Sequence, residues 1–82
     1  MINRTITKYE IIAWRDADNP QGPDYMDRFS TKRTAMAYAK KALERSHFPL
    51  LEVNRLEVNQ YDENDVWESA LIASWTNGKR TA

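Results

Sequence analysis

The chain has 82 residues, and its twelve basic and twelve acidic side chains cancel. This length predicts one domain, and a net charge near zero argues against strong non-specific binding to nucleic acid. The absence of cysteine excludes disulfides and cysteine zinc sites. Because no apolar run reaches membrane-spanning length and residues 1–4 are not an apolar leader, we expect a cytoplasmic protein without membrane contact.

The first half of the chain predicts two strands and a helix. Residues 5–15 are rich in β-branched and aromatic side chains, which favour a strand with Tyr9, Ile11 and Ala13 on one face. Two X-Pro pairs make residues 16–24 a loop, and residues 25–29 are expected to return as a short strand. Residues 31–46 follow as a strongly helical segment with Ser30 as its N-cap.

The second half predicts two longer strands. Residues 50–61 form the first, and its apolar positions change phase near Asn54–Arg55, which indicates either a bulge or a strand that is apolar on both faces. Residues 62–65 are expected to be a polar hairpin loop, and residues 66–76 the last strand, which is central or covered on both faces over residues 70–75. Residues 77–82 are expected to be a loose tail after a single domain over residues 1–76.

These elements predict an α+β fold in the order β(β)αββ. Three or four antiparallel strands would form the sheet, and the one helix would pack on one face. Three alanines, Ala35, Ala39 and Ala42, lie on the buried face of this helix and would let it approach the sheet closely. The other sheet face would be open or covered by a partner, including a second copy of the chain.

No catalytic, metal or cofactor motif is present in the sequence. His47 is the one histidine, and no serine lies in a nucleophile motif. The acids around Asp62 resemble a calcium loop, but the required spacing and central glycine are missing. We therefore expect a binding protein that is not an enzyme and that needs no cofactor or metal.

Charge and aromatic side chains mark the candidate binding residues. The helix carries five cations against one acid, while acids gather in residues 16–27 and 62–68. Such separation can steer a charged partner, although any amphipathic helix has a charged outer face. Trp and Tyr are common interface anchors, but they also fill cores. The candidate residues are Trp14, Tyr25, Arg28, Lys32, Arg33, Lys40, Lys41, Asp62, Glu63, Asp65 and Trp67.

The first turn of the helix is a further candidate. Lys32 and Arg33 lie where the helix dipole prefers acids, and the hydroxyls of Ser30, Thr31 and Thr34 surround them. This arrangement is similar to an anion site at a helix N-terminus. The alternative is that both cations point into water or pair with a nearby acid such as Asp27.

The second half also carries a resemblance. The run Val53-Asn54-Arg55-Leu56-Glu57 precedes a tryptophan-bearing strand and Asn77-Gly78-Lys79-Arg80, and all follow a Ser-Thr-initiated, alanine-rich helix. At the level of this pattern, residues 9–80 resemble small phage-encoded anti-CRISPR proteins that act on type I surveillance complexes.

The resemblance implies a non-enzymatic inhibitor in the host cytoplasm that docks on the Cas complex and blocks recognition of target DNA. Cations of the DNA channel would attract Asp62, Glu63 and Asp65, or else the helix cations would lie against RNA or DNA bound there. The alternative function is a small nucleic-acid-binding regulator that uses the basic helix 31–46.

Overall fold

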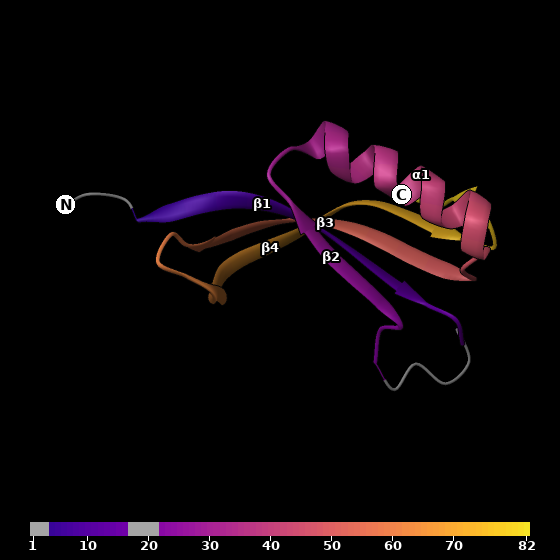
Figure 1. Cartoon of the computed structure of the whole chain (residues 1–82), viewed down its shortest axis with the longest axis horizontal. Helices are drawn as coiled ribbons and strands as arrows, with labels where there is room; N and C mark the ends of the chain where they lie inside the picture. Colours follow the sequence, from indigo (N-terminus) through magenta and orange to yellow (C-terminus); the bar gives the residue numbers. More distant parts are fainter. Residues whose placement is uncertain (1–3, 17–21) are drawn as a thin grey trace.

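The computed structural model describes residues 4–16 and 22–82, which form one helix packed on a five-stranded antiparallel sheet (Figure 1). The predicted α+β class is therefore confirmed. The elements are β1 (Thr5–Trp14), β2 (Tyr25–Phe29), α1 (Lys32–Ser46), β3 (Leu50–Asn59), β4 (Asp62–Thr76) and β5 (Lys79–Arg80). The strand order in the sheet is β2-β1-β3-β4-β5. Residues 1–3 of the predicted domain and 17–21 of the predicted loop lie outside the described residues.

The helix begins one residue later than the sequence predicted. Thr31, in extended geometry, is the N-cap, and its hydroxyl accepts a hydrogen bond from the Thr34 amide at 3.2 Å. Ser30 directly follows β2, and its hydroxyl accepts from Lys8 Nζ instead. At the other end, His47 adopts a left-handed conformation and its amide donates to the Leu43 carbonyl, which closes the helix before Pro49.

The main core lies between α1 and the sheet. Ala35 and Ala39 of the helix are fully buried, and small side chains there bring the helix close to the strands. On the sheet side this cluster contains Ile11, Ala13, Leu51, Val53 and Ala73. Figure 1 shows that α1 covers only one end of the sheet, while the start of β1 and the hairpin of β3 and β4 extend beyond it.

Strand β3 is apolar on both faces. Its pairing with β1 runs without a shift from Thr5↔Asn59 to Trp14↔Leu50, so the alternation of its side chains is never broken. Leu51 and Val53 therefore face the helix, whereas Leu56 and Val58 are buried on the opposite face. Of the two predicted explanations, the strand that is apolar on both faces is therefore correct. The pairing with β4 does shift between Val53 and Asn54, but the extra residue, Ile72, belongs to β4.

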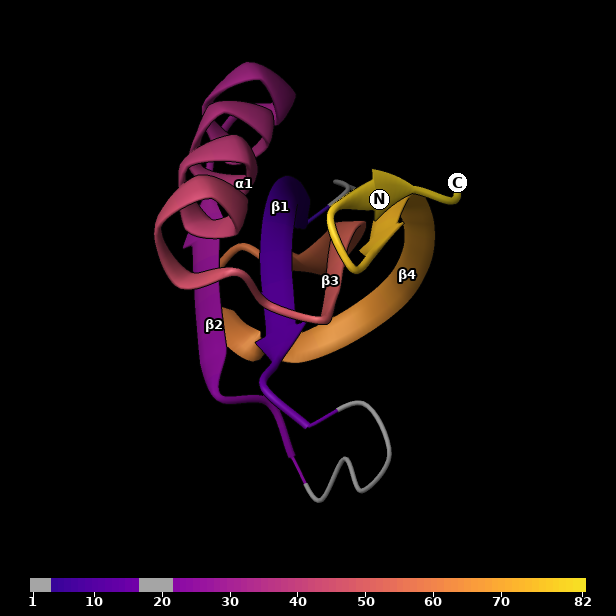
Figure 2. The same ribbon diagram turned by 90° about the vertical axis from the view of Figure 1, so that its right-hand side faces the viewer.

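The start of β4 departs from the predicted hairpin loop. The turn lies at residues 60–61, and Asp62 already pairs with Asn59. The next pair is Val58↔Val66, so residues 63–65 are extra residues in β4. They bring Glu63 to β1 and β2: its carboxylate lies 3.2 Å from Lys8 Nζ, and its carbonyl accepts from Arg28 Nη1. Figure 2 shows β4 curving under β1 on the side away from α1.

The C-terminal residues form a strand where a loose tail was predicted. Asn77 and Gly78 both have positive φ, as a two-residue turn of this kind requires, and β5 then pairs with Trp75 and Thr76. The Ser74 and Thr81 hydroxyls add a hydrogen bond of 2.7 Å. This pairing makes β4 an inner strand of the sheet at Trp75 and Thr76, whereas Leu71 is half exposed, so the prediction of a central or covered strand over residues 70–75 holds only in part.

Enlarging the buried face of α1 should destabilise the fold. Ala39→Leu inserts three carbons where the helix meets β3, so we expect a loss of about 1–3 kcal/mol in the free energy of unfolding. Ala37 is exposed on the same helix, and Ala37→Leu should change stability by less than about 0.5 kcal/mol. Urea unfolding followed by circular dichroism measures both; equal effects of the two variants would contradict this packing.

Candidate functional site

The candidate residues do not form one site. Asp62, Glu63, Asp65 and Trp67 lie at the end of the sheet that α1 leaves uncovered, and the helix cations lie at the other end. We call residues 61–68 the acidic arm, because this stretch holds four acids and no cation. A second surface, the basic groove, lies between the C-terminal half of α1 and β2.

The acidic arm exposes two large aromatic side chains. Tyr61, in the turn between β3 and β4, is 72% exposed, and Trp67, in β4, is 57% exposed. The Trp67 indole donates from Nε1 to Asp65 Oδ2 at 2.9 Å, and Arg4 donates to the Tyr61 hydroxyl at the same distance. Both rings are therefore held in place by polar contacts while their apolar surface stays in water.

Arg28 has structural contacts in the sheet. Its Nε lies 2.8 Å from Glu10 Oε2, and the Glu10 residue is only 7% exposed. The same guanidinium donates to the Glu63 carbonyl, so it joins β2 to β1 and to the acidic arm. Because a buried carboxylate needs a partner, these contacts show that Arg28 stabilises the fold.

Trp14 and the first turn of the helix lie apart from both surfaces. Trp14 is half buried and pairs with Leu50 on the sheet face opposite α1. Lys32 and Arg33 are exposed and form no ion pair with a described carboxylate. Asp27, the acid proposed as their partner, instead accepts from the Arg28 amide. The Thr31 hydroxyl donates to the Thr34 hydroxyl and accepts from the Thr34 amide, while the Ser30 hydroxyl accepts from Lys8 Nζ.

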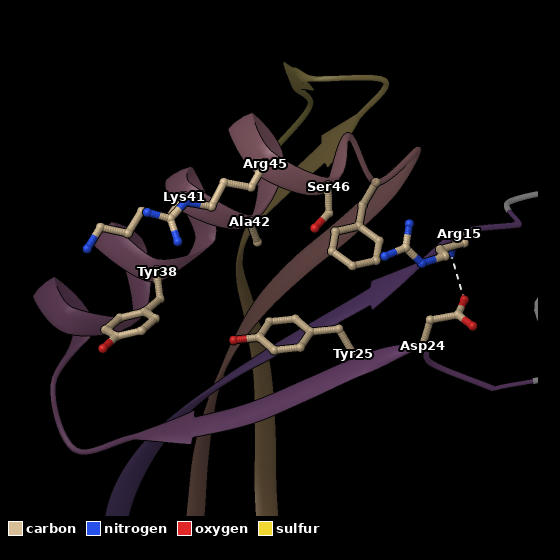
Figure 3. Close-up of a pocket in the computed structure, with 9 residues that line it drawn as sticks. Arg15, Asp24, Tyr25, Tyr38, Lys41, Ala42, Arg45 and Ser46 are labelled. Atoms are coloured by element: carbon tan, nitrogen blue, oxygen red, sulfur yellow. Dashed lines mark hydrogen bonds between the residues drawn. The ribbon is translucent and has the colours of Figure 1, made fainter.

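The basic groove is a hollow of about 460 Å³ whose walls come from several segments of the chain. Its lining residues are Arg15, Asp24, Tyr25, Tyr38, Lys41, Ala42, Arg45, Ser46 and Phe48. Figure 3 shows Lys41 and Arg45 on the helix side, Tyr25 on the β2 side with its hydroxyl directed toward Tyr38, and Arg15 beside Asp24. Tyr25 stacks on Phe48 with ring centroids 6.1 Å apart. Tyr25 and Lys41 were both predicted from the sequence to be binding residues, but not to be parts of one site.

Cations lie over the aromatic rings of this groove. Arg15 Cζ is 4.9 Å from the centroid of the Phe48 ring, and Lys41 Nζ is 5.4 Å from that of Tyr38. In the helix, the i, i+3, i+7 spacing of Tyr38, Lys41 and Arg45 places all three on one stripe. That stripe is the one sequence feature that indicates the helix side of the basic groove.

The Tyr25 hydroxyl remains protonated over the physiological pH range. Burial raises the pKa of Tyr25 above its ordinary value of about 10, and the nearby Asp27 carboxylate raises it further. The neutral phenol is a hydrogen-bond donor as well as an acceptor. The groove thus presents a hydroxyl donor next to its cations.

The described residues offer neither a metal site nor a membrane-spanning helix. No group of three or more histidine and acidic side chains there is arranged to hold a metal ion. Within residues 4–16 and 22–82, no helix has the length and apolar character needed to cross a lipid bilayer. Comparison with protein-family models, curated proteins and solved structures gave no match.

Removing Arg28 should destabilise the fold strongly. Arg28→Ala leaves the buried Glu10 carboxylate unpaired, which we expect to cost about 3 kcal/mol of unfolding free energy in chemical denaturation. Lys8→Ala removes the more exposed pair with Glu63 and should cost less than about 1 kcal/mol. The double variant Glu10→Met/Arg28→Met should recover most of the loss, and an Arg28→Ala effect as small as that of Lys8→Ala would contradict the assignment.

Tyr25 should make stability fall at alkaline pH. Since its pKa is raised in the folded state, the unfolded chain loses this proton first, so the contribution is complete below pH about 10 and is lost as pH rises through the folded-state pKa. Urea unfolding in steps above pH about 9 should give a shallower decline for Tyr25→Phe than for the unmodified chain. Parallel declines would show that Tyr25 is not the group concerned.

Proposed function

We propose that the chain acts by stoichiometric binding, as a non-enzymatic inhibitor that docks on a protein or nucleoprotein complex through the acidic arm. The observation that carries the proposal is the exposure of Trp67 and Tyr61 among four carboxylates. Covering a large aromatic side chain that is in contact with water lowers the free energy of the complex. Such side chains are enriched in interface hot spots.

The carboxylates define the chemistry of the partner. Asp62, Glu63, Asp65 and Glu68 share one eight-residue stretch of sequence with the two rings. Glu63 pairs with Lys8 and Arg4 lies over the Tyr61 ring, so Asp62, Asp65 and Glu68 are the acids of the stretch that form no ion pair within the described residues. A basic protein surface complements this arrangement and would be attracted to it over a distance of about one Debye length, ~10 Å at 0.1 M salt. Aromatic anchors would then supply the short-range contact.

The resemblance to phage anti-CRISPR proteins names one such partner. A surveillance complex of a type I CRISPR-Cas system holds target DNA in a basic channel, and an acidic arm placed there would compete with the DNA phosphates. In this proposal the phage protein protects phage DNA in the host cytoplasm. The binding set is the acidic arm, and half-buried Trp14, on the sheet face opposite α1, is available to a second copy of the chain.

The alternative function is a small nucleic-acid-binding regulator that uses the basic helix 31–46. It is supported by the five cations of α1, none of which pairs with a carboxylate of the described residues. The net charge of zero for the whole chain weighs against strong binding to any nucleic acid without a defined site.

The proposal is tested with a purified type I surveillance complex and its target DNA. The chain should reduce the amount of DNA bound in a mobility shift assay at a stoichiometry near one chain per binding site. Trp67→Ala should weaken this inhibition by at least about tenfold, because hot-spot aromatics typically contribute about 2 kcal/mol or more. Asp62→Asn/Asp65→Asn should weaken it most at low salt.

Lys32→Ala/Arg33→Ala is the matched control, since it also removes two charges but lies outside the arm. It should leave inhibition unchanged. Light scattering of the free chain separately reports whether a second copy binds on the sheet face opposite α1. Complexes from several type I systems that all bind target DNA normally in the presence of the chain would contradict the anti-CRISPR proposal. A larger effect of the helix variant than of Asp62→Asn/Asp65→Asn would favour the helix instead of the arm.

A further inference from the structure

We infer that the basic groove between α1 and β2 binds one nucleotide unit of a single-stranded nucleic acid, with the phosphate on the helix cations and the base against the aromatic wall. This inference names the site of the nucleic-acid alternative and does not depend on the acidic arm. It rests on the cations, rings and hydroxyls that the fold places in one hollow.

The cations of the groove are free to bind an anion. Arg15, Lys41 and Arg45 line it, and none of them forms an ion pair with a carboxylate in the described part of the chain. Asp24 is the acid among the lining residues, and its Oδ2 accepts from the Arg15 backbone amide at 2.7 Å. The carboxylate is thus directed to the backbone and leaves the guanidinium of Arg15 over the Phe48 ring.

The position of these cations favours a phosphate on the flank of the helix. The C-terminal end of α1 carries partial negative charge, which repels an anion placed on the helix axis. Lys41 and Arg45 are one turn apart and project along the side that faces the groove (Figure 3). Phosphate oxygens bound there are close to two positive charges and away from the exposed carbonyls.

The aromatic wall supplies the surface for a base. Phe48 is only 5% exposed and backs the ring of half-buried Tyr25, which stacks on it nearly parallel at 16°. The ring surface open to a base therefore belongs to Tyr25 and Tyr38, and Tyr38 packs against Phe29 with centroids 4.8 Å apart while it remains 46% exposed. Stacking of a base on such rings tolerates any sequence, because every base has a π face. The Tyr25 hydroxyl, a donor at physiological pH, adds a hydrogen bond next to the rings.

The size of the groove and the position of its rings favour a nucleotide of a single strand over a duplex. A hollow of about 460 Å³ lies in the range of small-ligand sites, so it can hold one nucleotide. A duplex presents stacked bases that cannot reach the aromatic wall, and a phosphopeptide would leave much of the wall unused. The further helix cations Lys32, Arg33 and Lys40 lie outside the groove, where they can meet the backbone of a longer strand.

Fluorescence anisotropy with the full chain tests the inference. The probes are labelled single-stranded DNA and RNA of mixed sequence, about twelve nucleotides long, within the range of known single-strand site sizes. With three cations engaged, log K should fall against log salt with a slope of about −2. Lys41→Ala/Arg45→Ala should weaken binding by about tenfold or more and reduce the slope to about −1.

Matched variants keep the result specific. Arg33→Ala/Lys40→Ala removes the same number of charges from α1 outside the groove and should weaken binding by less than about threefold, with a smaller change in slope. Tyr38→Leu keeps an apolar side chain against Phe29 but removes the ring, and should weaken binding by about tenfold through lost stacking. Circular dichroism establishes that each variant is folded.

Two further binding measurements identify the source of the nucleotide. A duplex of the same sequence should bind at least about tenfold more weakly than the single strand, because its bases are not free to stack. If AMP alone binds and is lost in Lys41→Ala/Arg45→Ala, the site takes a free nucleotide rather than a strand. Equal losses for the two double variants, or no binding of any probe, would overturn the inference. Trp67→Ala should leave probe binding unchanged, whether or not the acidic arm inhibits a surveillance complex.

Discussion

The structure depends on how β3 buries two apolar pairs that point in opposite directions. The helix has fifteen residues and reaches only one end of the sheet, so it can cover Leu51 and Val53 but not the opposite face. Leu56 and Val58 are nevertheless buried. Because no second helix exists in the described chain, the strands themselves must bend to exclude water from this face.

The extra residues in β4 provide that bend. Residues 63–65 enter between two adjacent pairs of the β3–β4 ladder and allow Glu63 to contact Arg28 of β2, three strands away in the sheet order. The contact closes the sheet partly on itself. As a consequence the acidic arm extends at one end of the molecule while the basic helix occupies the other, so the two proposed surfaces are separated by the fold rather than by charge alone.

The sequence predicted the elements better than their connections. Side-chain propensity located β2, α1 and most of β1, β3 and β4 within a few residues. The turn was misplaced because Asp62-Glu63-Asn64-Asp65 has the composition of a loop, although in the structure it belongs to a strand that bends. The basic groove was missed since Arg15, Tyr25, Lys41 and Phe48 come together only through the packing of β2 and the end of α1, which no local pattern contains.

The exposed edge of β4 bears on how a partner can bind. From Asp62 to Ala73 no described strand lies on its outer side, and such an edge would normally invite pairing with another chain. Two features oppose this: shifts interrupt its register, and carboxylates at Glu63, Asp65 and Glu68 repel a like edge. An edge that resists strand addition leaves the side chains of Trp67 and Tyr61 as the contact surface. Docking through the acidic arm is therefore expected to depend on those rings and on charge, and to tolerate a partner of any secondary structure that offers a basic, flat surface.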